Sequence, residues 1–63
     1  MTRKERIEAS INDMIQFGET FIGTIEVQGM TVVNYYKALN KKVEKEYNKV
    51  VCWDAETGMA WMA

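Results

Sequence analysis

The chain has 63 residues, of which 48% are hydrophobic, and its eight Lys and Arg against nine Asp and Glu give a net charge of −1. One cysteine and no histidine exclude an internal disulfide and remove the commonest general base and metal ligand, so we expect no enzymatic activity, no metal and no cofactor. The apolar content suffices for a core, and residues 1–63 are predicted to fold as one small domain.

The first predicted element is a helix from Arg3 to Phe17. Thr2 and Glu5 have the spacing of a capping box, in which each side chain binds the backbone N–H of the other. Gly18 supplies the residue type that ends a helix. The apolar residues between these ends recur at helical spacing and are Ile7, Ile11 and Met14, with Ile15 beside them.

Residues Thr20 to Gln28 are predicted to form a strand, because the period of the pattern changes to two. Gly23 falls inside this strand, where a bulge or a close approach of another backbone is tolerated. Gln28-Gly29 is predicted to end the strand. The apolar residues that alternate with polar ones are Phe21, Ile25 and Val27.

A second helix is predicted from Val32 to Lys49, with Thr31 as its N-cap. The alternative is a strand over residues 30–36, hairpinned through Gln28-Gly29, because this stretch is rich in strand-forming residues. We prefer the helix because one of its faces carries apolar residues at steps of three or four: Val32, Tyr36, Leu39, Val43, Tyr47 and Val50.

The opposite face of this predicted helix is basic, with Lys37, Lys41, Lys45 and Lys49 at steps of four and Lys42 beside them. Such a face attracts phosphates or steers an encounter with an acidic protein. A surface helix also needs a solvated side, for which lysine is a good helix-forming residue, and we favour this simpler explanation.

The chain ends in a predicted β-hairpin whose loop is Asp54-Ala55-Glu56-Thr57-Gly58. Asp54 can accept hydrogen bonds from the turn backbone, and Gly58 can take the positive φ that closes the loop. From a closing pair of Asp54 and Met59, Trp53 lies opposite Ala60. The elements then follow the order α-β-α-β-β.

We therefore predict an α+β fold with two amphipathic helices packed on a small three-stranded sheet. The strand–helix–strand crossover runs the first and second strands in parallel, and the hairpin adds an antiparallel third. Successive residues of a strand point to opposite faces, so Trp53 and Trp61 point opposite ways. A single layer of helices covers only one face, so one tryptophan is expected in the core and the other in an exposed apolar patch.

A short segment resembles the turn and recognition helix of bacterial helix-turn-helix repressors: Gly29-Met30-Thr31 followed by Val33, Tyr36, Lys37 and Leu39. The resemblance covers barely a dozen residues. It implies a small DNA-binding regulator that uses the lysine face, with the hairpin similar to the wing of winged-helix proteins. The hairpin departs from such a wing because its tip carries Asp54 and Glu56, which repel a polyanion.

The favoured function is a non-enzymatic interaction protein, of the kind that phages and mobile elements use to bind and block a larger host protein such as a defence nuclease. The expected contact residues are Trp61, Met59 and Met62, with Trp53 in place of Trp61 if Trp53 points outward. DNA binding is the alternative function, and a homodimer formed through the same patch is a third possibility.

We expect a cytoplasmic protein that does not insert into membranes. No apolar run approaches the roughly 18 residues of a transmembrane helix, and residues 1–17 are too charged for a signal peptide. The single cysteine suits a reducing compartment.

Overall fold

A computed structural model describes residues 2–23 and 30–63 of the chain. It has the predicted α+β layout and the predicted element order α-β-α-β-β. The elements are α1 (Arg3–Phe17), β1 (Thr20–Phe21), α3 (Met30–Tyr47), β2 (Val51–Trp53) and β3 (Met59–Met62).

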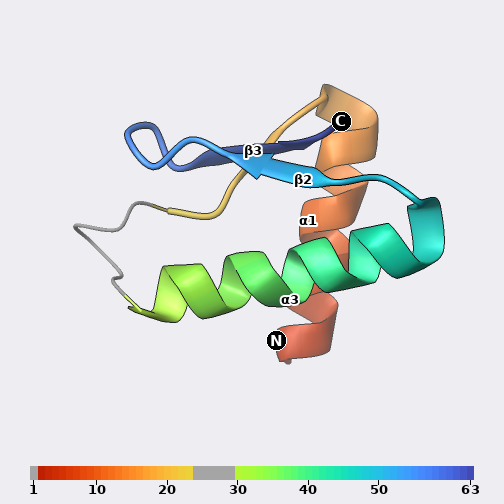
Figure 1. Ribbon diagram of the computed structural model, residues 1–63, viewed down its shortest axis with the longest axis horizontal. Helices are drawn as coiled ribbons and strands as arrows, with labels where there is room; N and C mark the ends of the chain where they lie inside the picture. The colour runs from red at the N-terminus through yellow and green to blue at the C-terminus, as the bar shows by residue number, and fades with distance from the viewer. Residues whose placement is uncertain (1, 24–29) are drawn as a thin grey trace.

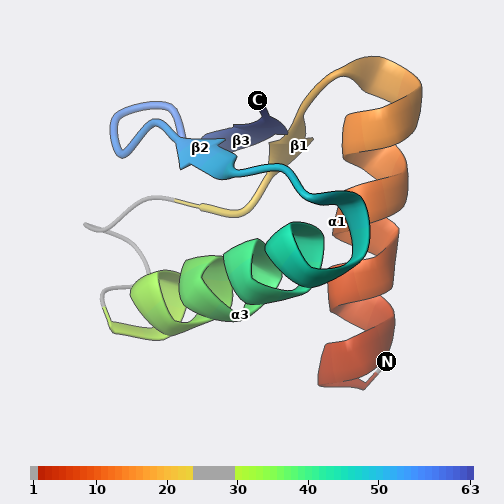
Figure 2. The ribbon, with the colours of Figure 1, turned by 45° about the vertical axis from the view of Figure 1, so that its right-hand side comes forward.

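The three strands form an antiparallel sheet in the order β1-β3-β2 (Figure 1). β1 and β2 run in the same direction, as the crossover predicts, but β3 lies between them and pairs with both. α3 lies beneath the sheet, and α1 crosses behind both of them. The 45° view shows that α1 runs past the sheet and that no helix lies over the upper face of the sheet among the described residues (Figure 2).

α1 forms over the predicted residues because both of its ends are capped. The Glu5 N–H donates to Thr2 Oγ1 at 3.2 Å, and the Thr2 N–H donates to Glu5 Oε1 at 3.0 Å, which completes the capping box. These hydrogen bonds, foremost the one from the Thr2 backbone, hold the pKa of the Glu5 carboxyl below its usual value. Gly18 ends the helix with a φ of 85°. Ile15, which lies beside the apolar residues predicted at helical spacing, is exposed.

α3 is a helix throughout, so the strand alternative for residues 30–36 is wrong. It begins at Met30, which places Thr31 inside the helix instead of at its N-cap. It ends at Tyr47 because Asn48 takes a left-handed φ of 55° and donates its N–H to the Glu44 carbonyl at 3.2 Å.

The early end of α3 corrects two further expectations. Tyr47 and Val50 were predicted as the last residues of the apolar face of this helix, here called its apolar stripe, but both are exposed. Val32, Leu39 and Val43 of the same stripe are fully buried. The stripe is interrupted because the chain leaves the helix after Tyr47 and turns toward β2. Lys49 therefore lies beyond the helix.

β1 is shorter than predicted, and residues 24–28 of the predicted strand lie outside the described residues. After β1 the chain stays beside the hairpin, because the N–H groups of Ile22 and Gly23 both donate to the Gly58 carbonyl, at 2.8 and 3.2 Å. The Thr20 hydroxyl donates to Asp13 Oδ2 at 3.3 Å, which ties β1 to α1.

The core lies where α1, α3 and the lower face of the sheet meet. A polar contact fixes the crossing of the two helices: the Tyr35 hydroxyl donates to the Arg6 carbonyl at 3.0 Å and is 2.5 Å from the buried Ser10 Oγ. The Arg6 guanidinium also lies over the Tyr35 ring, 5.7 Å from its centroid. The buried apolar residues of this cluster are Ile7, Ile11, Met14, Ile22, Leu39, Val43, Val51 and Ala60.

Candidate protein-binding face

The hairpin has the predicted register, so the two tryptophans lie on opposite faces of the sheet. Trp53 pairs with Ala60, and Cys52 pairs with Trp61. The loop closes as expected, since the Glu56 N–H donates to Asp54 Oδ1 at 2.9 Å. Alternation along the strands then assigns every sheet residue to one of two faces.

The inner face of the sheet faces the helices and comprises Thr20, Val51, Trp53, Ala60 and Met62. Ala60 is fully buried because it lies on the central strand and faces the helices. Trp53 is half-buried and stacks on Tyr36 with a centroid distance of 5.5 Å. Its indole N–H donates to the Gly23 carbonyl at 3.3 Å, so both the ring and its polar group are used inside the fold.

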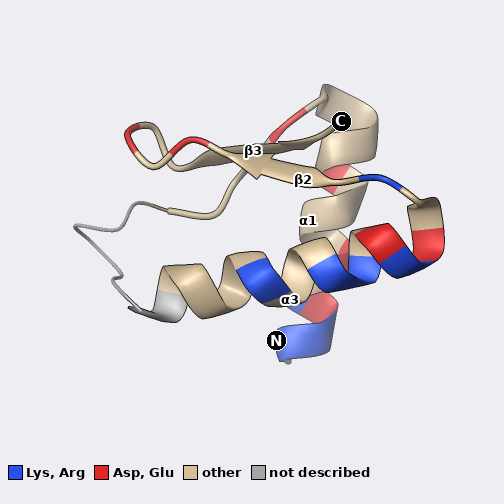
Figure 3. Ribbon diagram, viewed as in Figure 1, with Lys and Arg blue, Asp and Glu red and all other residues tan. Residues whose placement is uncertain are grey.

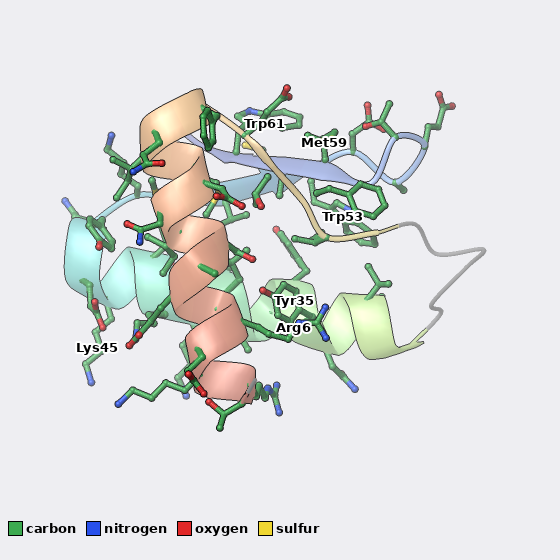
Figure 4. The ribbon with its side chains drawn as sticks, turned by 180° about the vertical axis from the view of Figure 1, so that it is seen from behind. Arg6, Tyr35, Lys45, Trp53, Met59 and Trp61 are labelled. Carbon is green, nitrogen blue, oxygen red and sulfur yellow. The ribbon has the colours of Figure 1, made fainter. Side chains whose placement is uncertain are left out.

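The outer face of the sheet comprises Phe21, Val50, Cys52, Met59, Trp61 and Ala63. Every one of these side chains is apolar or weakly polar. Phe21 is 62% exposed, Val50 52% and Trp61 38%. Figure 4 shows Trp61 and Met59 on the side of the sheet away from α3, with Trp53 on the side toward it. Among the described residues no acceptor binds the Trp61 indole N–H.

The structure therefore separates the contact residues predicted from the sequence. Met59 and Trp61 lie together on the outer face, while Met62 and Trp53 pack against the core. Met62 follows Trp61 directly, so the two side chains necessarily point to opposite faces. The four residues cannot form a single patch.

Besides Met59 and Trp61, the outer face contains residues that were not predicted as contacts, among them Phe21, Val50 and Cys52. Phe21 joins the outer face because β1 pairs with β3 in the register Phe21↔Met59, a long-range pairing that no local pattern indicates. Val50 joins it because its N–H and carbonyl exchange hydrogen bonds with Ala63, at 3.2 and 2.8 Å. Val50 lies two residues before Cys52 and therefore on the same face. The sequence would have identified Val50 if the predicted hairpin had included the pair of Val50 and Ala63.

The open edge of β2 is covered by side chains of α3. Val50 and Ala63 exchange both hydrogen bonds, so the backbone groups of Val51 point away from β3. Asn40 Oδ1 accepts from the Val51 N–H at 2.9 Å, and the Tyr36 hydroxyl donates to the Val51 carbonyl at 3.1 Å. At this residue the edge has no free backbone group for an added strand.

Gly58 brings β1 against the base of the hairpin loop. It has a φ of 77°, and a Cβ there would clash with the Gly23 carbonyl and lie 2.7 Å from Phe21 Cε1. The absence of a side chain lets the Gly58 carbonyl accept the two N–H groups of the segment after β1. Gly58 thus sets the position of Phe21 on the outer face.

The predicted lysine face divides in a similar way. Lys37, Lys41 and Lys45 are exposed on α3, and Figure 4 shows Lys45 directed away from the sheet. Lys42 is half-buried and lies 3.6 Å from carboxylate oxygens of both Glu8 and Glu46. Exposed Lys49 lies in the connection to β2. Lys45 therefore points away from the outer face, whereas Lys49 lies next to Val50 of that face.

A shallow groove of about 210 Å³ lies where Lys42 bridges α1 and α3. It is smaller than the roughly 300 Å³ at which small-molecule sites begin, and its lining is mainly polar. Among the described residues no three side chains of metal-ligating type converge. The residues that line the groove are Glu8, Ile11, Asn12, Lys42, Glu46 and Tyr47.

Comparison of the chain with protein-family models, with curated proteins and with solved structures finds no match. Neither helix, over the described residues, has the length and apolar character needed to cross a membrane.

Proposed function

We propose that this chain is a non-enzymatic interaction protein whose outer face docks onto a larger protein. The observation that carries the proposal is Trp61. This large side chain stands on a sheet face that no described element covers, and its indole N–H has no acceptor among the described residues. Tryptophan is strongly enriched among the residues that dominate binding energy in protein interfaces.

The face, and not the edge of the hairpin, is the binding surface in this proposal. Addition of a strand to β2 would have to displace Asn40 and Tyr36 from Val51. The outer face needs no such rearrangement, because Phe21 and Trp61 are already exposed. Met59 pairs with Phe21 and lies two residues before Trp61 on β3. It supplies an adaptable side chain next to both aromatic residues.

The expected biological role is that of a small inhibitor that blocks a larger host protein, as the sequence suggested for a phage or mobile-element product. A single apolar face on so small a domain supports a blocking or recruiting role. We place the protein in the cytoplasm, where a reducing environment keeps the thiol of Cys52 on the outer face in its free form.

The test begins with the partner. Immobilised protein is used to isolate binding proteins from the source cells, and the one identified by mass spectrometry is purified. The Kd is then measured for the wild type, for Trp61→Ala and for Met62→Ala. We expect Trp61→Ala to weaken binding roughly 30-fold, which corresponds to about 2 kcal/mol.

Met62→Ala is the matched control, because Met62 is the next residue of β3 but lies on the inner face. Its Kd should stay close to that of the wild type wherever the variant is folded by circular dichroism. Equal Kd values for the wild type and Trp61→Ala would refute the proposal. So would a sedimentation experiment in which the protein dimerises through Trp61 and no other protein binds.

The DNA-binding alternative keeps one observation in its favour, the exposed lysines of α3. Its turn, at Gly29, lies outside the described residues. The described part differs from a helix-turn-helix unit in that the strand β1 lies between α1 and α3. Tight, steeply salt-dependent binding of duplex DNA, lost on Lys41→Gln, would favour this alternative over ours.

A further inference from the structure

The outer face is too small to form a stable interface by itself. Strands lie about 4.8 Å apart and rise about 3.4 Å per residue, so three short strands span roughly 200 Å² in the plane of the sheet. A standard interface buries roughly 800 Å² on each partner, whereas the whole molecule exposes 4387 Å². A partner seated on Trp61 must therefore also contact the surroundings of the outer face.

These surroundings are acidic. The sheet side of the molecule, residues 18–23 and 49–63, contains one basic residue, Lys49, against three acidic ones, a net charge of −2. The acidic residues are Glu19, directly before β1, and Asp54 and Glu56, in the hairpin loop. Figure 3 shows them as red segments at the tip of the hairpin and between α1 and β1.

Most basic residues lie on the other side. The helical side, residues 2–17 and 30–48, holds seven of the eight Lys and Arg against five acidic residues, a net charge of +2. In Figure 3 the blue segments lie on α3, at the start of α1 and just before β2. The last of these is Lys49, at the end of the outer face remote from the hairpin loop. The small net charge of the chain thus hides a separation of charge.

We infer that the outer face docks onto a basic protein surface, one that presents arginine side chains around an apolar centre. This inference rests on the proposed function and specifies its partner. A guanidinium can stack on an exposed aromatic ring such as Phe21 or Trp61 while it pairs with a neighbouring carboxylate. The charge separation turns the acidic sheet side toward such a partner during the encounter.

The same charges disfavour two other arrangements. Two copies of the chain meeting through their outer faces bring six carboxylates, against two Lys49 ammonium groups, together around a small apolar contact. An acidic partner steered by the lysines of α3, as the sequence suggested, would approach the side of the molecule away from Trp61. The lysine face is then the solvated side of the complex.

The experiment uses the full chain and a defined probe, a short synthetic peptide of alternating arginine and leucine. Two matched peptides replace every arginine by glutamine or by glutamate. Binding is followed by NMR through the indole N–H of Trp61 and the methyl group of Met59, with the indole N–H of Trp53 as an inner-face reference. The arginine peptide should shift the two outer-face signals and leave that of Trp53 nearly unchanged.

The carboxylates that surround the outer face, the rim carboxylates, are tested with Glu19→Gln and Glu56→Gln. The matched control is Glu44→Gln, which changes an exposed glutamate on α3. Each rim substitution should weaken the arginine peptide roughly two- to fivefold at low salt, while the control leaves its Kd unchanged. Adding salt shortens the Debye length from about 30 Å at 0.01 M to about 3 Å at 1 M and should weaken binding in the same direction.

The outcomes separate this inference from the proposed function. If the glutamine peptide shifts the Trp61 and Met59 signals with the same Kd as the arginine peptide, the outer face binds apolar surface without regard to charge. The proposed function then stands and the inference is wrong. The inference also fails if the glutamate peptide binds more tightly or if the arginine peptide leaves the outer-face signals unmoved. A wild-type Kd for Trp61→Ala with the purified partner would instead refute the proposed function.

Discussion

The two faces of the sheet are built from the same kinds of residues, but one packs against the core and the other is exposed. The inner face carries Trp53 and Met62, and the outer face carries Trp61 and Met59. Composition does not distinguish these pairs. The difference arises because α3 packs on one side of the sheet and α1 runs past it, so that no described helix lies over the other side (Figures 1 and 2).

The polar groups of the two tryptophans show the same contrast. The N–H of Trp53 is bound to the Gly23 carbonyl and its ring stacks on Tyr36, so the fold uses the whole side chain. Trp61 has neither contact among the described residues. Trp61 still exposes 38% of its surface, and a large aromatic residue with a free polar group at the surface is of the kind that dominates protein interfaces.

The largest expected effect comes from exchanging each tryptophan for alanine. Trp53→Ala removes a stacked, hydrogen-bonded ring from the core and should lower the free energy of unfolding by about 3 kcal/mol. Trp61→Ala should lower it by only about 1 kcal/mol. Urea denaturation followed by circular dichroism measures both values.

Met62→Ala and Met59→Ala repeat the comparison with a smaller side chain. Met62 packs against the core, so its replacement should destabilise the protein more than that of Met59. If the outer-face variants lose as much stability as the inner-face ones, the outer face is a second core surface. The distinction between the two faces would then be wrong.

A smaller effect is expected from two glycines that share a positive φ. A Cβ at Gly18 meets nothing within 4 Å, so Gly18→Ala should cost only the backbone strain, about 1 kcal/mol. A Cβ at Gly58 meets the Gly23 backbone and the ring of Phe21, so Gly58→Ala should cost about 2 kcal/mol or more. Urea denaturation of both variants measures the difference.

Gly58→Ala should also disturb the outer face, because it pushes β1 away from the hairpin. The NMR signals of Phe21 should shift in this variant and stay in place in Gly18→Ala. Equal losses of stability in the two variants would show that the close approach of β1 to Gly58 is not needed for the fold.

Local patterns in the sequence predicted the local parts of the fold. The ends of α1 follow from Thr2, Glu5 and Gly18, whose capping contacts join residues within one turn of the helix. The register of the hairpin follows from its loop, because Asp54 and Gly58 determine the closing pair. That register was enough to predict that the tryptophans point to opposite faces.

The remaining features depend on contacts between distant segments. Which tryptophan points outward depends on the side on which the helices pack, and Phe21 joins the outer face only because β1 pairs with β3. The end of α3 depends on a left-handed Asn48, which the apolar stripe through Tyr47 conceals. Met62 was predicted as a contact because methionine is common in binding surfaces. Its position next to Trp61 already placed it on the opposite face of the sheet.

The smallest expected effect concerns the edge of β2 and separates the face from the edge as binding surface. Asn40→Ala leaves the Val51 N–H without its acceptor and should lower the free energy of unfolding by about 1 kcal/mol. Tyr36→Phe removes the donor to the Val51 carbonyl and retains the stacked ring. Urea denaturation measures both changes, and sedimentation reports whether the opened edge pairs with a second copy.

The double variant Asn40→Ala with Tyr36→Phe exposes the backbone of Val51 while the outer face stays intact. If it self-associates, adding Trp61→Ala should not reverse the association, because the edge and the face are separate surfaces. Its affinity for a partner bound through Trp61 should also stay near the wild-type value. Loss of that affinity on opening the edge, with the protein still folded, would show that the partner docks along β2 and that the outer face is not the binding surface.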